Sequence, residues 1–321
     1  MQQLEKFQDF LIATQRHLNL PTSPAHLYDS IRYILDLGGK KVRPILVYLG
    51  ADSFGEIHTD VEKMALVIEL FHNFSLMHDD IMDEADLRRN KPTVHKKWNT
   101  PTAILGGDAL LVKTYEILNS LDSPSKSELM SLYNKVALEV CEGQQMDMNF
   151  ESQQEVSTDE YLEMIRLKTA VIMGASLQAG ALLNGADPTM QQLMYDFGES
   201  LGIAFQLKDD YLDCYGSSDF GKKTGGDILV NKKTYLRIMS ENAHDSAFKQ
   251  KIRDLDTEKD ASKKITETLA IYNETNTKLA TENAMATYYN KGLRLLDNLS
   301  ILSDKKQQLI DFAELLWNRE K

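Results

Sequence analysis

The sequence DDIMD at residues 79–83 recurs as DDYLD at residues 209–213, and the rest of the chain is organised around these two copies. Each copy lies in a run of helical periodicity, where residues three and four apart share one face, so its carboxylates stand close together. Like charges at that spacing destabilise a helix unless a cation lies between them. Carboxylate oxygens suit Mg²⁺, which takes one or two carboxylates together with waters and substrate phosphates. The repeat therefore predicts two metal-binding walls that face one cavity.

A solvated acidic face is the simpler interpretation of a single motif of this kind. Both copies, however, stand among apolar side chains, such as Met77 and Ile81 in the first run and Leu207 and Leu212 in the second. These neighbours favour positions that face the interior, so we prefer the metal-binding interpretation. The candidate metal ligands are Asp79, Asp80, Asp83, Asp209, Asp210 and Asp213.

The composition indicates a chain that can bury a large core and carries an excess of acidic side chains. Of 321 residues, 42% are hydrophobic, and 36 basic against 48 acidic side chains give a formal charge of −12. No long basic run is present, which argues against a nucleic-acid partner. Two cysteines, Cys141 and Cys214, are too few for a disulfide framework and indicate a reducing compartment. Because no signal-peptide core and no bilayer-length apolar run are present, we expect a cytoplasmic protein without stable membrane insertion.

Helical periodicity dominates the chain. Only 7 Pro and 17 Gly interrupt it, and no run alternates strictly between apolar and polar residues. We expect helices over roughly 4–17 and 25–36, a long helix that ends near Asp83, and a polar loop over 84–98. The sequence therefore predicts one all-α domain over residues 1–321, a helical bundle around a central cavity.

Two capping boxes mark expected helix starts. Thr59 with Glu62, and Ser157 with Glu160, both fit the pattern in which a hydroxyl residue is followed three positions later by Glu. We expect the second box to open a helix that continues to about residue 183.

Basic residues occur in clusters although the chain as a whole is acidic. Arg grips phosphate through two hydrogen bonds, and Lys acts as a point charge. Any one of these lysines alone would be interpreted as a solvated surface residue. Their coincidence with two acidic motifs indicates a substrate that carries a diphosphate, or two such substrates. The clusters are Lys40 with Arg43, Arg88 with Arg89, Lys168, Lys222 with Lys223, and Lys232 with Lys233.

Together these motifs resemble those of the trans-type polyprenyl diphosphate synthases, the farnesyl and geranylgeranyl diphosphate synthase family, almost from end to end. The segments that carry the resemblance are GGKKVRP at 38–44, LMHDDIMDEADLRRNKPTVH at 76–95, GGDALL at 106–111, GQQMDM at 143–148, LKTA at 167–170, FQLKDDYLD at 205–213, GKKTGGD at 221–227 and NKKT at 231–234. The departures are small: Lys41 stands where many relatives have Arg, and Asn90 stands where Gly is common. Neither position is assigned to chemistry.

The resemblance implies an isoprenoid synthase fold, a homodimer and a role for each matching residue. Three Mg²⁺ would be held by Asp79, Asp83 and Asp209, with Asp80, Asp210, Asp213 and Asp227 in support. The allylic diphosphate would be held by these ions and by Arg88, Lys168, Lys223 and Lys232. The diphosphate of isopentenyl diphosphate would be held by Lys40, Arg43, His72 and Arg89. Dipoles near the developing cation would come from Lys168, Thr169 and Gln206. His78 and His95 are expected to make only structural hydrogen bonds. Residues 319–321 help to close the site in relatives, but a frayed end is the simpler expectation here.

The activity that the resemblance implies is head-to-tail (1'-4) condensation of isopentenyl diphosphate with an allylic diphosphate. The product would be a short-chain all-trans prenyl diphosphate, with C20 geranylgeranyl favoured over C15 farnesyl. Two alternatives stay open. A terpene cyclase of the same fold usually replaces the second acidic motif with an Asn/Ser/Glu set and needs no isopentenyl site. A non-catalytic regulatory subunit of a prenyl synthase would be expected to lose acidic residues from one motif.

The residues upstream of the first motif are expected to set the product length. A helix rises about 1.5 Å per residue, so a side chain five positions before Asp79 lies about 7.5 Å deeper. That residue is Phe74, and Ser75 follows it. The resembling family uses these two positions as the floor of its pocket, so Phe74 is expected to block the growing chain, while Ser75 leaves room beside it.

Overall fold

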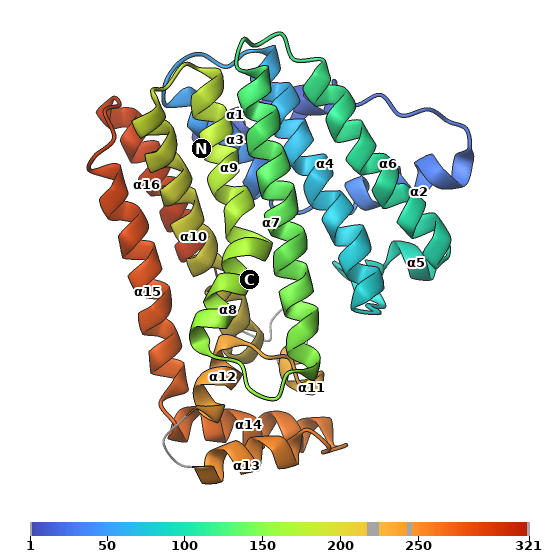
Figure 1. The fold of residues 1–321 in the computed structure, drawn as a ribbon, viewed down its shortest axis with the longest axis vertical. Helices are drawn as coiled ribbons and strands as arrows, with labels where there is room; N and C mark the ends of the chain where they lie inside the picture. Colours follow the sequence, from blue (N-terminus) through green and yellow to red (C-terminus); the bar gives the residue numbers. More distant parts are fainter. Residues whose placement is uncertain (1, 217–224, 243–245, 320–321) are drawn as a thin grey trace. The chain divides into compact units, whose positions relative to one another are not determined.

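The computed structural model describes residues 2–216, 225–242 and 246–319, and these residues are almost entirely helical (Figure 1). Within these ranges the extended segments are β1 (Leu87–Arg88) and β2 (Lys91–Pro92), which form a short antiparallel hairpin. The all-α prediction is therefore confirmed. No helix in the described ranges has both the length and the apolar character needed to cross a bilayer.

The chain divides into two compact units. The first comprises Met1–Lys135, Ala175–Tyr195 and Ser300–Lys305, and the second comprises Val136–Gly174, Asp196–Leu299 and Lys306–Lys321. The first acidic motif belongs to the first unit and the second motif to the second unit. That all residues form one domain stays a prediction.

The first unit is built around α4. Its helices are α1 (Gln2–Gln15), α2 (Ala25–Asp36), α3 (Val42–Asp52), α4 (Thr59–Met82), α5 (Val94–Lys97), α6 (Thr100–Asn119) and the first turns of α7 (Lys126–Ser152). α4 packs against α3 on one side and α6 on another (Figure 1). In its amino-terminal half, α4 buries apolar side chains on nearly every side, as in the run from Val61 to Ile68. Burial on all sides is typical of a central helix.

Two glycines let α3 and α9 (Val171–Leu183) approach backbone to backbone. A Cβ at Gly50 would lie 2.2 Å from the carbonyl oxygen of Leu177, and a Cβ at Gly180 would lie 2.1 Å from that of Val47. No larger residue fits either position without moving a helix. This contact belongs entirely to the first unit.

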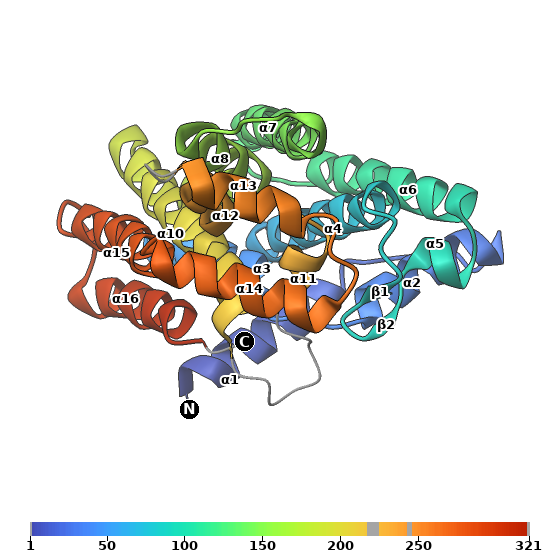
Figure 2. The same cartoon turned by 90° about the horizontal axis from the view of Figure 1, so that it is seen from below.

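The second unit holds the rest of α7, the first residues of α9 and the remaining helices. They are α8 (Thr158–Ile165), the π-helical turn η1 (Arg166–Ala170), most of α10 (Pro188–Tyr215), α11 (Gly226–Leu229), α12 (Tyr235–Glu241), α13 (Ser246–Leu255), α14 (Ala261–Glu274), α15 (Thr277–Leu296) and most of α16 (Ser303–Trp317). Figure 2 shows α13 and α14 side by side, with α11 against α14. One buried cluster includes Tyr161, Ile203 and Leu207, and a second includes Leu236 and Tyr272.

Helix starts agree with the sequence at one capping box and disagree at the other. Ser157 Oγ accepts from the Glu160 N–H at 3.1 Å and the Glu160 carboxylate accepts from the Ser157 N–H at 2.8 Å, as predicted. The Thr59 box is wrong, because α4 is capped by His58 without a side-chain bond and Thr59 is already helical. The Glu62 carboxylate instead lies 2.7 Å from His17 Nε2.

Two expected boundaries also need correction. The helix expected from Ser157 to about residue 183 is interrupted at Arg166–Ala170 by η1. In this π-helical turn the backbone hydrogen bonds join residues five apart instead of four. The polar loop expected over 84–98 contains the hairpin and α5.

Candidate active site

The first acidic motif lies at the carboxyl end of α4 and is tied to the hairpin. Asp80 is buried and accepts hydrogen bonds from Arg88 Nε at 2.8 Å and Arg88 Nη2 at 2.7 Å. Asp79 lies 3.7 Å from the same guanidinium, and exposed Asp83 caps the helix. Burial raises the pKa of the Asp80 carboxyl, and the Arg88 bonds oppose that shift. Arg88 therefore holds one edge of the motif and leaves Asp83 open to solvent.

The second motif occupies the last two turns of α10. Asp210 is buried and accepts from the Tyr161 hydroxyl and, at 3.2 Å, from Gln206 Nε2. Gln206 in turn accepts from Thr169 Oγ1 at 3.1 Å. Burial, followed by the charge of Asp227, raises the pKa of Asp210 to about 7. The structure thus joins two of the predicted catalytic residues to the motif itself.

Both motifs stand where a helix least favours negative charge. The carboxyl end of a helix carries partial negative charge, so acidic residues there are destabilising. Asp79 and Asp83 lie at the end of α4, and Asp209 and Asp213 lie within two turns of the end of α10. Helix stability does not account for this placement, and a bound cation would.

A short segment after α10 is fastened to the second motif. The Asp213 carboxylate accepts from the Asp227 N–H at 2.9 Å, and the Asp213 carbonyl accepts from the Gly225 N–H at 2.6 Å. The Asp227 carbonyl accepts from the Lys232 N–H at 2.9 Å. Asp227 and Lys232, both predicted from the sequence, are therefore positioned through the motif. Lys223, predicted with them, lies outside the described residues.

Arg319 also contacts the second motif. Its Nη2 lies 2.7 Å from Asp209 and donates to the Phe205 carbonyl at 2.8 Å. The guanidinium also stacks on the Phe205 ring, 3.6 Å from its centroid. The prediction of a frayed end is therefore wrong at Arg319, because an ion pair and a ring contact hold it. Residues 320–321 lie outside the described residues.

The π-helical turn presents Lys168. Its ammonium lies 2.7 Å from Asp147 on α7, and a Cβ at Gly143 would lie 2.3 Å from the Lys168 nitrogen. π-helical turns inside α-helices are frequent at functional sites. Asp147 received no role from the sequence, although the four-residue spacing from Gly143 to Asp147 puts both on one face of α7 and could have indicated it.

Cationic side chains gather around Gly38 and Gly39 in the first unit. Arg89 donates to the Gly38 carbonyl, and a Cβ at Gly39 would lie 2.5 Å from the Arg89 guanidinium. Both glycines have positive φ, +81° and +119°, which side chains rarely allow. Burial lowers the pKa of Arg89. Glycine here lets Arg89 reach the loop that carries the exposed Lys40.

Arg43 and His72 complete this cluster. Arg43 Nη1 lies 3.2 Å from His72 Nε2. Burial, followed by nearby cations with Arg43 first, lowers the pKa of His72 well below its ordinary value. A neutral ring that accepts from Arg43 at Nε2 carries its proton on Nδ1. The predicted role of His72 as a diphosphate donor would thus fall to Nδ1.

The sequence missed the acid that balances these cations. Lys41 Nζ lies 2.7 Å from Glu69, whose carboxylate also accepts from Asn73 at 2.8 Å. Lys41 was set aside as a departure from the family pattern, but it links the loop to α4. Glu69 lies one helical turn before Asn73 and has no local motif to mark it.

The predicted floor residues lie in the last three turns of α4. The Phe74 ring is half-buried, with its centroid 4.8 Å from that of His78 and 5.6 Å from that of Phe71. Ser75 Oγ donates to the His72 carbonyl at 2.9 Å. His78 Nε2 lies 3.2 Å from the Ile104 carbonyl, so the structural hydrogen bond expected of it is confirmed. His95 Nδ1 is buried without a hydrogen-bond partner among the described residues, so the bond expected of His95 is not observed at that atom.

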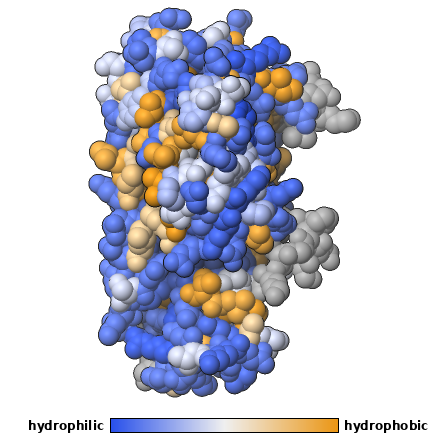
Figure 3. Space-filling model, turned by 90° about the vertical axis from the view of Figure 1, so that its right-hand side faces the viewer, coloured by the Kyte–Doolittle hydropathy of each residue, from blue (hydrophilic) through white to orange (hydrophobic). Residues whose placement is uncertain are grey.

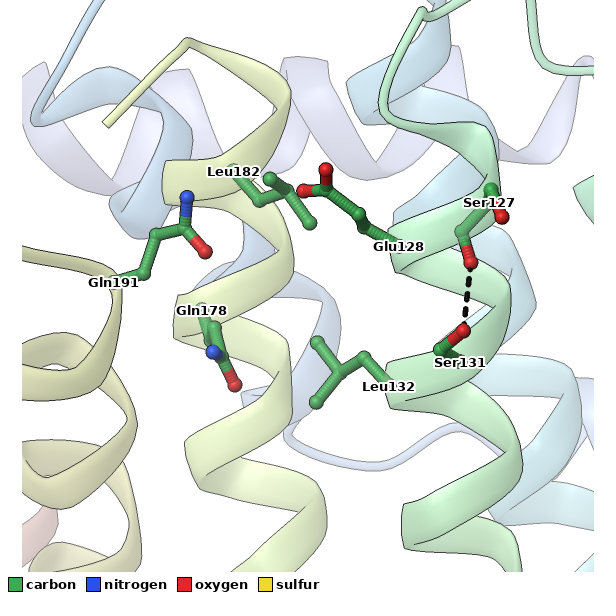
Figure 4. Close-up of a pocket in the computed structure, with 7 residues that line it drawn as sticks. All are labelled: Ser127, Glu128, Ser131, Leu132, Gln178, Leu182 and Gln191. Atoms are coloured by element: carbon green, nitrogen blue, oxygen red, sulfur yellow. Dashed lines mark hydrogen bonds between the residues drawn. The ribbon is translucent and has the colours of Figure 1, made fainter. Parts of the chain in front are cut away.

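A cavity of about 310 Å³ opens elsewhere in the first unit, between the first turns of α7, the end of α9 and the start of α10 (Figure 4). Its lining residues are Ser127, Glu128, Ser131, Leu132, Gln178, Leu182 and Gln191. No cation is among them, and Glu128 would repel phosphate. This cavity therefore does not suit a diphosphate.

Comparison with known proteins decides the family. The family model described as Polyprenyl synthetase matches residues 24–272, which include both acidic motifs. The chain belongs to the polyprenyl synthetase family.

Similar polyprenyl synthetases extend the match over nearly the whole chain. A geranylgeranyl diphosphate synthase of Methanosarcina mazei is 36% identical over 306 residues, 93% of this chain and 91% of that protein. A geranylgeranyl pyrophosphate synthase of Geoglobus acetivorans is 43% identical over 217 residues, 67% of this chain and 68% of that protein. A crystal structure of a geranylgeranyl pyrophosphate synthase, 42% identical, superposes with a TM-score of 0.89 over 99% of this chain and 97% of that one.

Proposed function

We propose that the chain is a prenyltransferase that joins isopentenyl diphosphate head to tail to an allylic diphosphate, with a C20 product favoured. The observation that carries the proposal is the cationic cluster around Gly38 and Gly39. Arg89 contacts Gly38, Arg43 contacts His72, and the charges of Arg43 and Arg89 both act on His72. That cluster suits a second diphosphate, which condensation requires and cyclisation of one substrate does not. The similarity to geranylgeranyl diphosphate synthases supports the C20 preference.

The acidic motifs fit Mg²⁺ by the chemistry of their donors. All are carboxylate oxygens, which Mg²⁺ prefers. Among the described residues, no group of three or more His, Cys, Asp or Glu is arranged to hold a metal ion. In proteins Mg²⁺ commonly takes one or two carboxylates and completes its shell with water and substrate phosphate. Asp79, Asp83 and Asp209 would hold the three expected ions, which would stabilise the charge on the departing diphosphate. That the two motifs face one cavity stays a prediction.

The remaining predicted side chains would position the allylic diphosphate and stabilise the developing carbocation. Arg88 holds Asp80 and would add positive charge beside the allylic diphosphate. Thr169 and Gln206 form a hydrogen-bonded pair whose oxygens would face the developing carbocation. Burial, followed by the charge of Arg43, lowers the pKa of His72, and its Nε2 faces the Arg43 guanidinium, so His72 is a weak base and unsuited to remove a proton. The released diphosphate would accept the proton that the product loses.

The test of the function is an assay of purified protein with isopentenyl diphosphate, an allylic diphosphate and Mg²⁺. Condensation to prenyl diphosphates of defined length supports the proposal. Cyclic hydrocarbon formed from the allylic substrate alone would identify a terpene cyclase. If product forms only after another prenyl synthase is added, the chain would be a regulatory subunit. The intact acidic motifs in both units argue against that alternative.

The product length is expected to change when Phe74 is shortened. Phe74→Ala removes a ring five positions upstream of Asp79, about 7.5 Å deeper along α4. Products longer than those of the wild type by one or more five-carbon units are expected, as resolved by chromatography. The matched control is Phe54→Ala, a half-buried ring that follows α3. An unchanged product length in the Phe74 variant would mean that another residue forms the floor.

The expected homodimer has a candidate surface on α6. Leu105 and Val112 are 60% and 64% exposed, and Ile104 and Tyr115 lie on the same helical face. Figure 3 shows hydrophobic residues gathered among polar ones on one side of the molecule. An exposed apolar stripe of this kind marks interaction sites, and we propose that a second copy covers it.

The dimer is tested by light scattering after chromatography. Leu105→Glu combined with Val112→Glu is expected to convert a dimer to a monomer, because two charges would be buried without partners. Leu302→Glu, at an equally exposed leucine between α15 and α16, should leave the dimer intact. A wild-type monomer would refute the proposal.

A further inference from the structure

Lys264 on α14 is a buried lysine that pairs with no carboxylate among the residues that the structure describes. It is 5% exposed, and lysine is almost never this buried unless it is paired. Its ammonium donates to the Leu229 carbonyl at 3.2 Å and to the Asp256 carbonyl at 3.3 Å. Leu229 is the last residue of α11, where carbonyl oxygens lack helical partners. The lysine thus ties α14 to the end of the short helix α11.

Other contacts converge on the same place. Asn231 Nδ2 donates to the Asp256 carbonyl at 3.2 Å, so the amide and the ammonium share one acceptor. Beside them, a Cβ at Gly225 would lie 2.9 Å from Ile265, which shows how closely the two segments pack. The segment 225–231 is therefore held at its start by packing against α14. At its end it is held by one polar contact to α14, through Lys264, and one to the turn after α13, through the Asp256 carbonyl.

This segment carries the groups that the proposed function needs. Asp227 lies within α11, and Lys232 follows Asn231 directly. On the other side the segment is bonded to Asp213 in the second acidic motif. Among the described residues, no hydrogen bond joins Lys264 to that motif. Any effect of Lys264 on the reaction would therefore pass through the segment 225–231.

An apolar side chain would fill this position at lower cost if packing were the only need. Burying an ammonium is unfavourable unless hydrogen bonds replace its water. The cavity beside Lys264, Asn231 and Asp256 measures about 10 Å³, which admits at most one water molecule. The Leu229 and Asp256 carbonyls therefore replace most of the water that the ammonium would bind in solution. The ammonium in turn holds these two carbonyls in place.

We propose that Lys264 is a positioning residue, which holds Asp227 and Lys232 in place to receive the allylic diphosphate and its metal ions. The proposal rests on the proposed function for its chemical meaning. The anchoring itself can be measured without metal or substrate.

The first measurement is hydrogen–deuterium exchange without Mg²⁺ or substrate. In Lys264→Met, amides in residues 225–234 are expected to exchange about tenfold faster, because the hydrogen bonds that oppose local opening of this segment are lost. The matched control is Lys263→Met, at the exposed neighbour that pairs with Glu258 at 2.6 Å, and its exchange should equal that of the wild type. Unchanged exchange in Lys264→Met would overturn the anchor. If that variant does not fold, Asn231→Gly removes the second contact and keeps the positive φ of 57°.

The second measurement is steady-state kinetics with each substrate varied. In Lys264→Met, kcat/KM for the allylic diphosphate is expected to fall about tenfold or more, as for other residues that orient metal ligands. KM for isopentenyl diphosphate should stay within about twofold, because its proposed ligands belong to the first unit. Faster exchange with unaltered kinetics would overturn the positioning role. A wild type without prenyltransferase activity would defeat the proposed function, while the exchange result would still decide the anchor.

Discussion

Asp79→Ala is expected to lower kcat by at least about a thousandfold, or about 4 kcal/mol of transition-state stabilisation. The loss follows because Asp79 supplies one of the few carboxylates that can share a cation with the departing diphosphate. Arg88 already occupies its neighbour Asp80, so that residue cannot readily take over. Steady-state turnover with saturating Mg²⁺ measures the effect.

The fold should survive this substitution. Asp79 lies in the last turn of α4, where negative charge is unfavourable and alanine is the best helix former. The thermal midpoint is therefore expected to stay or to rise. Asp86→Ala removes an exposed aspartate beside the motif that pairs with Lys96 at 2.9 Å, and it should keep wild-type turnover. Full activity in Asp79→Ala would refute the metal role of the first motif.

Helix boundaries could be predicted where proline or glycine residues mark them. The helix expected over 25–36 is confirmed as α2, which starts directly after Pro24 and ends two residues before the pair Gly38-Gly39, because proline and glycine act through the local backbone. The π-helical turn at Arg166–Ala170 has no such marker, since its residues are ordinary helix formers. The cap expected at Thr59 failed for a related reason: a capping motif fixes a boundary only when nothing outside the helix competes for its groups, and His17 contacts Glu62.

The candidate site divides in the same way. Residues in recurring motifs, such as Arg88 and Gln206, were predicted and do contact their motifs. Partners such as Glu69, Asp147 and Tyr161 were missed, because each reaches its contact from another helix or turn. Their spacing in sequence follows from how helices pack, which a linear pattern does not encode.

Arg237→Met is expected to destabilise the protein by about 3–5 kcal/mol, the largest stability change that we predict. Arg237 is 8% exposed, and its guanidinium binds both oxygens of Asp256 at 2.8 Å and Glu241 at 2.7 Å. Methionine fills a similar volume but leaves Glu241, also 8% exposed, as a buried charge without this partner. The loss is measured as the change in unfolding free energy from urea denaturation.

The effect can be separated from a general loss of positive charge. Arg253→Met removes an exposed arginine on the neighbouring helix α13 and should change the free energy by no more than about 0.5 kcal/mol. Arg237→Met combined with Glu241→Met removes both charges and should recover part of the loss, because no acid then stays buried alone. If the single variant costs less than about 1 kcal/mol, Glu241 must find water or another donor, and the ion cluster does not hold Asp256. In that case the acceptor shared by Lys264 and Asn231 would need support from elsewhere in the second unit.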